Sequence, residues 1–178
     1  MVFVAVRVCE ETNEKMHDCA YNLCREMLSG LGVSSQIEKE KSGKPRAFGA
    51  FISISHSHGA VCCAVNARAG ELKIDNALLF CYDADFCDIG VDIEPIHTSH
   101  KIRKIAEKIF SPAEREYLRA GEEYERFFNI YTRKEAYLKK TGAGLSGIKM
   151  ADTFSLPDTF ITERINLCDR EYIFSVCS

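Results

Sequence analysis

Apolar and polar residues alternate at the start of the chain in a way that is typical of a β-strand. Valine occupies every second position of residues 2–8, and this period of two predicts a strand there. Apolar residues then recur at helical spacing over residues 16–27, and Gly30 and Gly32 indicate where that helix ends. Residues 38–46 are polar and contain a Gly-Lys-Pro sequence, which predicts a loop. The chain is therefore expected to begin with a strand, a helix and a loop.

The middle of the chain is rich in short apolar runs that predict further strands. Residues 48–55 and 60–67 are typical of two strands joined by a tight turn at residues 57–59. Residues 77–82 are another strand candidate, and residues 89–93 form a short β-branched strand. This part of the chain is therefore expected to be mostly sheet.

Helical spacing returns in the second part of the chain. Apolar positions over residues 102–109 predict an amphipathic helix, and its other face is basic. Residues 111–114 combine a capping box with proline at the first helical position, so a second helix is expected to begin there. Residues 121–125 predict a polar connection, and the apolar stripe over residues 127–138 predicts a longer helix that ends before a glycine-rich turn.

The order of the predicted elements repeats along the chain. Residues 159–165 and 171–176 are the last strand candidates, so strand, helix and strands are followed by strand, helices and strands. We therefore predict an α+β fold that is pseudo-duplicated, with an N-terminal half over residues 1–87 and a C-terminal half over residues 88–178. Each half is expected to be a small antiparallel sheet packed with helices. The interface between two such halves is a natural place for a site.

The composition is ordinary for a soluble globular protein. Of 178 residues, 46% are hydrophobic and 28% are charged. A formal net charge of −3 argues against a general affinity for nucleic acid, and the apolar runs are too short to span a membrane. The first residues lack the pattern of a signal peptide. The nine cysteines are odd in number and include no Cys-x-x-Cys pair, which favours a reduced, cytoplasmic location.

Two short phrases carry the candidate chemistry. Asp92 and Glu94 lie two apart in a predicted strand, so their side chains leave the same face. Glu135 and Lys139 lie four apart in a predicted helix and also share a face. Each pair alone is explained as well by a solvated strand face or a surface ion pair. Together, three carboxylates and a lysine are what a Mg²⁺-assisted reaction on a phosphate ester requires.

Three other residues leave two interpretations open. Glu114 is the third residue of the capping box, which explains it fully, and it is also a candidate catalytic carboxylate. His56 lies among hydroxyls at the end of a strand, where a phosphate could bind, although a lone histidine is more often structural. Lys44 is either a solvated lysine or a phosphate anchor. A Ser-His-Asp hydrolase is excluded because no Gly-x-Ser-x-Gly sequence is present.

Five phrases together resemble a known family. In order and rough spacing they are similar to motifs of the 4′-phosphopantetheinyl transferases, and the length resembles the two-half Sfp type of that family. The phrases occupy residues 43–45, 51–57, 89–94, 110–114 and 134–139.

The resemblance implies a fold, a reaction and a metal. The fold would be the two-half 4′-phosphopantetheinyl transferase fold. The reaction would move the 4′-phosphopantetheine arm of coenzyme A to a serine of an apo acyl or peptidyl carrier protein and release adenosine 3′,5′-bisphosphate. By resemblance, the Mg²⁺ ligands would be Asp92, Glu94 and Glu135. Either Glu135 or Glu114 would accept the serine proton, and Lys139 would steady the pyrophosphate.

The resemblance also implies a coenzyme A site. Ser55 and His56 would contact the nucleotide end, Lys44 its phosphate, and Asp92 and Lys139 the pyrophosphate. The family often has tryptophan three residues before the Lys-Glu-Ala phrase, where this chain has Tyr131. The family also often carries a basic N-terminal stretch, whereas residues 10–18 are mostly acidic or polar here.

Partners and alternatives follow from the same features. The expected partner is an acidic helical carrier protein, attracted by the basic face of the helix over residues 102–109. A monomer is expected, because two halves in one chain already supply the interface. The absence of a basic N-terminal stretch, which the family often uses to bind the nucleotide phosphate, motivates an alternative. The alternative is a catalytically silent protein that binds coenzyme A. A cysteine-rich metal or redox protein is a third possibility that rests only on the cysteine count.

Overall fold

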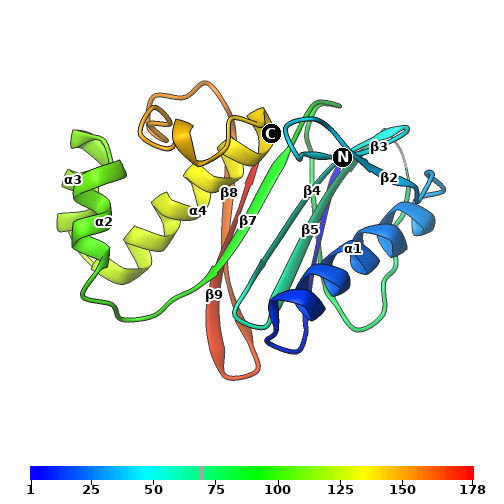
Figure 1. Cartoon of the computed structure of the whole chain (residues 1–178), viewed down its shortest axis with the longest axis horizontal. Coiled ribbons are helices and arrows are strands. Elements are labelled where there is room, and N and C mark those ends of the chain that lie inside the picture. The colour runs from blue at the N-terminus through cyan, green and yellow to red at the C-terminus, as the bar shows by residue number, and fades with distance from the viewer. Residues whose placement is uncertain (69) are drawn as a thin grey trace.

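Two antiparallel β-sheets pack face to face between layers of helices in the computed structural model, which describes residues 1–68 and 70–178 (Figure 1). The first sheet has the strand order β2-β3-β4-β5-β1-β6, and the second has the order β7-β9-β8. The strands of the first sheet are β1 (Val2–Val8), β2 (Ile37–Lys39), β3 (Pro45–Ala47), β4 (Ala50–Ser57), β5 (Ala60–Ala67) and β6 (Leu78–Tyr82). The strands of the second sheet are β7 (Gly90–Pro95), β8 (Phe160–Leu167) and β9 (Arg170–Cys177).

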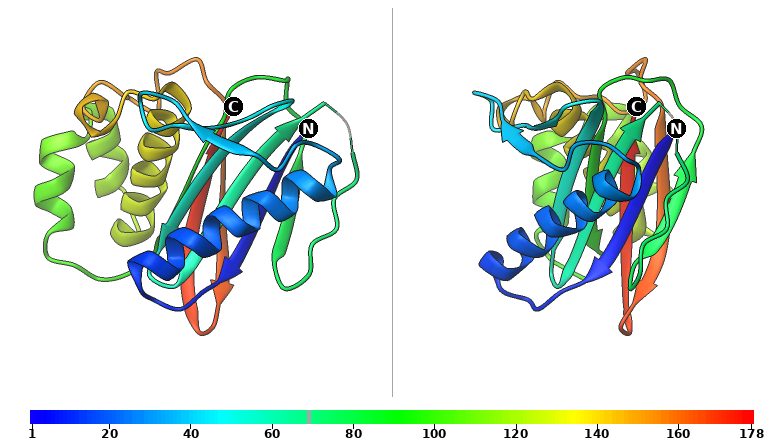
Figure 2. Two further views of the ribbon diagram at one scale, coloured as in Figure 1. Left: turned by 45° about the vertical axis from the view of Figure 1, so that its right-hand side comes forward. Right: turned by 90° about the vertical axis from the view of Figure 1, so that its right-hand side faces the viewer.

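Helices cover the two outer faces of this pair of sheets. Helix α1 (Asn13–Gly30) lies across the first sheet, and the remaining helices lie on the side of the second sheet (Figure 2). These are α2 (Ile102–Ile109), α3 (Pro112–Arg119) and α4 (Glu123–Thr141), followed by the short 3₁₀ helix η1 (Leu145–Gly147). None of the helices in the described part of the chain is long and apolar enough to cross a membrane.

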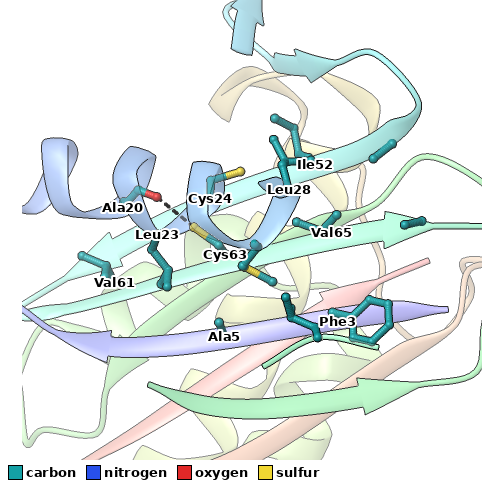
Figure 3. Close-up of a cluster of buried hydrophobic side chains, with 14 of the residues drawn as sticks. Phe3, Ala5, Ala20, Leu23, Cys24, Leu28, Ile52, Val61, Cys63 and Val65 are labelled. Carbon is teal, nitrogen blue, oxygen red and sulfur yellow. Dashed lines mark hydrogen bonds between the residues drawn. The ribbon is translucent and has the colours of Figure 1, made fainter. Parts of the chain in front are cut away.

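The alternation of β1 explains the layers. Phe3 and Ala5 point to the α1 side and join the cluster beneath that helix (Figure 3). Val2, Val4 and Val6 point the other way and pack against the second sheet. Both faces of β1 are therefore buried, because a helix covers one face and a sheet covers the other.

Two tight turns connect the longest hairpins. His58 and Gly59 join β4 to β5 with φ values of 46° and 83°, and Cys168 and Asp169 join β8 to β9 with φ values of 46° and 63°. Two consecutive residues of positive φ match the right-handed twist of the strands that they connect. The tight turn expected near residues 57–59 is confirmed.

Most of the elements predicted from periodicity are present, with two corrections. The loop predicted over residues 38–46 contains most of β2 and the start of β3, which pair as a short antiparallel hairpin. The connection predicted over residues 121–125 is partly wrong, since α4 begins at Glu123. The α+β class with antiparallel sheets is confirmed.

The division into two halves remains a prediction. The chain changes from the first sheet to the second between β6 and β7, and thus in the region of the expected boundary between residues 87 and 88. The two sheets differ in their number of strands and in the helices that cover them. Internal duplication is accordingly kept as a prediction.

Helix α4 crosses β7 at a point where only glycine fits. A Cβ atom added to Gly90 would overlap the carbonyl oxygen of Ala136 and lie 2.6 Å from the amide nitrogen of Lys140. Both are backbone atoms, which cannot move aside as a side chain can. The close approach brings the middle of α4 against the acidic residues of β7.

All nine cysteines lie in the described part of the chain and are free thiols. Cys24, Cys62, Cys63 and Cys177 are buried, as expected for cysteines that act as small hydrophobic residues.

Candidate active site

Asp92 is the centre of a hydrogen-bonded group that three elements contribute. Its Oδ1 atom accepts a hydrogen bond from the Ser55 hydroxyl of β4 at 2.8 Å. The same atom lies 2.7 Å from the Lys139 ammonium of α4, which also donates to the Ser55 oxygen at 2.7 Å. Asp92 is only 4% exposed, so this interaction is poorly screened by water. Residues far apart in the sequence, 55, 92 and 139, thus meet at one carboxylate.

Two further carboxylates lie near Asp92, and burial together with the negative charge of Asp92 raises the pKa of each. Burial, followed by the charge of Asp92, raises the pKa of Glu94 to about 7. The pKa of Glu135 is raised by the same two causes in the same order. Like charges that share a buried site oppose one another's ionisation. The structure therefore brings together the three carboxylates and the lysine that the sequence singled out.

The donor set fits a hard divalent cation. The Oδ2 atom of Asp92 and the Oε1 atom of Glu135 are buried and have no hydrogen-bond partner among the described residues. Carboxylate oxygens are the ligands that Mg²⁺ prefers, and clustered carboxylates with unpaired oxygens are electrostatically favourable to a cation.

These carboxylates do not form a closed metal cage. Within residues 1–68 and 70–178, no group of three or more His, Cys, Asp and Glu side chains is arranged to hold a metal ion by itself. The Lys139 ammonium is instead the cation next to Asp92. Mg²⁺ sites in phosphate chemistry commonly use one or two carboxylates and complete their coordination with substrate phosphates. An open site of this kind does not require a closed cage.

A cavity of about 350 Å³ opens beside this group. Glu135, Lys139 and His56 line it, together with the loop that follows α4. Burial, and then the charge of Lys139, lowers the pKa of His56, so the imidazole is neutral at neutral pH. A cavity of this size lies within the range of small-molecule sites in proteins.

The opposite wall of the cavity comes from α1, which the sequence did not identify as part of a site. His17 and Tyr21 line the cavity, and their ring centroids lie 4.6 Å apart. The Lys39 ammonium lies 5.3 Å from the centroid of the Tyr21 ring. The spacing of two aromatic rings at i and i+4 on the exposed face of α1 was the signal available in the sequence.

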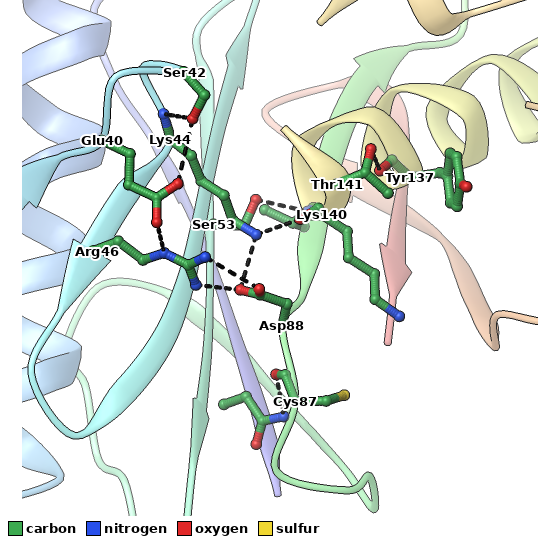
Figure 4. A network of polar contacts seen from close by, with 12 residues as sticks. Glu40, Ser42, Lys44, Arg46, Ser53, Cys87, Asp88, Tyr137, Lys140 and Thr141 are labelled. Atoms are coloured by element: carbon green, nitrogen blue, oxygen red, sulfur yellow. Dashed lines mark hydrogen bonds and ion pairs between the residues drawn. The ribbon is translucent and has the colours of Figure 1, made fainter. Parts of the chain in front are cut away.

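Lys44 reaches the cavity, but its ammonium is engaged elsewhere. It donates to Asp88 at 2.9 Å and to the carbonyl oxygen of Lys140, and Arg46 binds the same Asp88 carboxylate (Figure 4). Lys44 is only 8% exposed. Of the two interpretations that the sequence left open, these contacts do not favour a solvated lysine, and the role of phosphate anchor stays a prediction.

Glu114 stands apart from the group around Asp92. It forms an ion pair with Lys134 at 2.8 Å, and both side chains are 0% exposed. One carboxylate oxygen completes the capping box at Ser111, and the other accepts two hydrogen bonds from Thr153. The contacts thus favour the structural interpretation, and the catalytic role of Glu114 stays a prediction.

Tyr131 is a further residue whose place at the site the sequence did not reveal. It lies one turn before Glu135 on α4. Burial raises the pKa of its phenol, and the charges of Glu135, Glu94 and Asp92 raise it further. The sequence had indicated only that the family often has tryptophan at this position.

Comparison with known proteins places the second part of the chain in a known family. The sequence model of a family described as the 4′-phosphopantetheinyl transferase superfamily matches residues 88–177, which contain Asp92, Glu94, Glu135 and Lys139.

Two curated relatives carry the same activity in their names. The 4′-phosphopantetheinyl transferase HetI of Nostoc sp. (strain PCC 7120 / SAG 25.82 / UTEX 2576) is 29% identical over 140 residues, which are 71% of this chain and 52% of that protein. The Synechocystis sp. (strain ATCC 27184 / PCC 6803 / Kazusa) protein slr0495, provisionally named a 4′-phosphopantetheinyl transferase, is 38% identical over 63 residues, which are 34% of this chain and 26% of that protein. The aligned segments thus span about half of HetI and a quarter of slr0495. Because the family match covers half of the chain, this protein belongs to the 4′-phosphopantetheinyl transferase superfamily.

Proposed function

We propose that this protein transfers the 4′-phosphopantetheine arm of coenzyme A to a serine hydroxyl of an apo carrier protein, with Mg²⁺ as cofactor. The observation that carries the proposal is the convergence of Asp92, Glu94, Glu135 and Lys139 beside one cavity. Membership of the superfamily supports the reaction class.

The reaction requires one bond to form and one to break. The serine oxygen of the carrier attacks the phosphorus atom that bears the pantetheine arm. The bond from that phosphorus to the oxygen bridging the pyrophosphate breaks, and adenosine 3′,5′-bisphosphate leaves. Such transfers depend mainly on positioning and on neutralisation of the leaving charge.

The residues of the site have distinct roles in this scheme. Asp92, Glu94 and Glu135 would hold Mg²⁺, which supplies Lewis-acid neutralisation of the phosphate oxygens when it is bound. Lys139 supplies a second positive charge and donates hydrogen bonds to the departing phosphate oxygens. The neutral imidazole of His56 can donate one hydrogen bond toward the nucleotide end.

Glu135 is the carboxylate we assign to proton transfer. A general base works best when its pKa lies near the working pH, and burial together with Asp92 raises that of Glu135. Its buried Oε1 atom has no hydrogen-bond partner among the described residues. Glu135 thus accepts the serine proton, directly or through water, while Glu114 remains committed to Lys134.

The nucleotide end of coenzyme A would lie along the α1 wall. The Tyr21 and His17 rings offer flat surfaces on which a purine can stack, and Lys39 brings positive charge beside Tyr21. This arrangement supports coenzyme A binding even though residues 10–18 are not basic.

The carrier protein would approach from the side of α2 and α3. A groove of about 450 Å³ lies between these helices, and Arg103, Arg115 and Arg119 are among the residues that line it. A basic surface favours an acidic carrier and accelerates its encounter with the site.

A transfer assay tests the proposal. Purified protein, coenzyme A, Mg²⁺ and an apo carrier should increase the mass of the carrier by that of the phosphopantetheine arm. Glu135→Gln should reduce the rate by about a hundredfold or more, because a positioned base typically contributes at least that factor. Glu71→Gln, at an exposed position between β5 and β6, is the matched control and should retain the wild-type rate. No mass increase on either acyl or peptidyl carriers would contradict the proposal.

A catalytically silent protein that binds coenzyme A is the second candidate. The aligned segment covers only 52% of HetI, so the match does not extend over the whole of that enzyme. Coenzyme A affinity measured with and without Mg²⁺ separates the two candidates. Binding that is independent of the metal, without transfer, would favour the silent protein.

A further inference from the structure

Strand β4 presents a row of serine hydroxyls to β7. The Ser53 oxygen accepts a hydrogen bond from the Val91 amide at 2.9 Å, Ser55 donates to Asp92 at 2.8 Å, and Ser57 donates to Glu94 at 2.6 Å. The three serines occupy alternate positions and therefore share one face of the strand.

These hydroxyls link the two sheets at the site. Strands β4 and β7 belong to different sheets, and the backbone ladders of the described residues join β4 to β5 and β7 to β9. Side chains therefore set how the acidic strand lies against the first sheet. Ser55 shares its contacts with Lys139, whereas the bond from Ser57 goes to Glu94 alone among the carboxylates.

The hydroxyl of Ser57 has a defined direction. It has one hydrogen, and Glu94, when ionised, can only accept a hydrogen bond. The Nδ1 atom of His58 lies 2.8 Å from the same oxygen, so the imidazole donates to Ser57 while Ser57 donates to Glu94. This chain of donors holds the Oε2 atom of Glu94 and leaves its Oε1 atom for another partner.

We propose that Ser57 is a positioning residue that fixes the Glu94 carboxylate for metal binding, and that His58 in turn orients the Ser57 hydroxyl. The inference rests on the proposed function, because it assigns Glu94 to the metal. Removing a group that orients a metal-binding carboxylate in this way commonly weakens metal binding by about 10–100-fold.

Mn²⁺ binding measured by electron paramagnetic resonance in the presence of saturating coenzyme A tests this role without a transfer step. Ser57→Ala should weaken Mn²⁺ binding by about tenfold. Ser57→Thr keeps the hydroxyl on a strand that tolerates β-branched residues, and it should restore wild-type affinity. Ser99→Ala is the matched control, because among the residues that the structure describes its hydroxyl bonds only to the Lys101 amide, just before α2.

His58→Gly is a second variant that does not depend on the folding of Ser57→Ala. Residue 58 has a φ value of 46°, which glycine adopts without strain, so this change removes the donor to Ser57 and preserves the turn. It should also weaken Mn²⁺ binding, by a smaller factor.

The outcomes separate this inference from the proposed function. Wild-type affinity in both Ser57→Ala and His58→Gly would overturn the positioning role and leave the proposed function intact. A loss in Ser57→Thr equal to that in Ser57→Ala would also overturn it, because the hydroxyl would then be irrelevant. If the wild-type protein bound no Mn²⁺ with coenzyme A present, the metal site of the proposed function would be contradicted. The positioning role of Ser57 would then be contradicted as well.

Discussion

Glu94 is buried strongly enough that its protonation changes in the physiological range of pH. Its pKa is raised from 4.5 to about 7 by burial and by Asp92, a shift that corresponds to about 3 kcal/mol. Because the pKa of Glu94 is higher in the folded than in the unfolded state, folding is more favourable when this carboxyl group is protonated. The stability that Glu94 contributes is therefore complete below about pH 4.5 and is lost as the pH rises through about 7.

Mg²⁺ should therefore stabilise the protein more in mildly alkaline than in mildly acidic solution. A metal must displace the proton of Glu94 at about pH 6, whereas little proton remains to be displaced at about pH 8. Thermal denaturation with and without Mg²⁺ at these two values measures the difference. Glu94→Gln should abolish the difference, and an equal shift of Tm at both pH values in the wild-type protein would contradict the interpretation.

Glu114→Gln should affect stability rather than chemistry. The change leaves the Lys134 ammonium buried without its partner, and breaking a buried pair in this way costs about 3–5 kcal/mol. Chemical denaturation measures the loss, and the transfer rate per folded molecule should stay close to that of the wild type. A catalytic Glu114 would show the opposite result, with a lost rate and little change in stability.

Single residues differed in how well the sequence predicted their surroundings. The capping box at Ser111 and Glu114 was visible because both partners are local. The contact of Glu114 with Lys134 could not be predicted, since it depends on how α3 packs against α4. The Lys44 contact with Asp88 is equally non-local and was missed for the same reason.

At the level of elements, the crossing of α4 over β7 positions the candidate site. Gly90 allows the helix backbone to approach the strand at Ala136 and Lys140. Glu135 directly precedes the first of these contact residues, and Lys139 directly precedes the second. Any side chain at residue 90 would push α4 outward. The glycine in this acidic phrase thus has a packing reason independent of chemistry.

Gly90→Ala should therefore lower both stability and transfer. We expect a loss of about 3 kcal/mol in the free energy of unfolding, since overpacking against backbone cannot be relieved by a rotamer change. Gly30→Ala is the control, because its added methyl group would meet the end of the Leu72 side chain, which can move. Chemical denaturation and the transfer assay measure the two effects, and a fully active Gly90→Ala variant would show that the close approach is dispensable.

The elements that the sequence predicted well are those with long periodic patterns. β1 and the core of α4 show several repeats of their period, and β5 is a continuous apolar run. In contrast, β2 and β3 have three residues each and lie in a polar, proline-containing segment. The start of α4 was misplaced because its first turn is acidic and Glu122 makes no side-chain capping bond. Acidic residues nevertheless suit a helix N-terminus electrostatically.

The whole molecule determines what no segment shows alone. Serine from the first sheet, aspartate from the second sheet and lysine from the helical layer meet only when the layers assemble. The sequence identified these residues by motif. Their hydrogen bonds, the α1 wall of the cavity and the place of Tyr131 required tertiary packing, which periodicity does not encode.

Carrier recognition is a property of the whole surface, and charge reversal tests it. Lys104→Glu combined with Lys108→Glu on the exposed face of α2 should raise the KM for an acidic carrier by about tenfold at low salt. The effect should shrink at high ionic strength because of screening. Lys73→Glu, at an exposed position in the connection between β5 and β6, is the control and should leave KM unchanged. If the wild-type protein and the Lys104→Glu/Lys108→Glu variant had equal KM values across the salt range, the carrier would bind a surface other than the exposed face of α2.

The ammonium of Lys139 beside Asp92 has a consequence for the stability of the protein in the absence of the proposed Mg²⁺. Lys139 supplies one positive charge within the cluster, so we expect the protein to fold without the ion, in contrast to domains that unfold when a chelator removes their metal. Depletion of Mg²⁺ would then leave the protein folded but inactive. This folded protein would regain transfer activity as soon as Mg²⁺ was restored, without new protein synthesis.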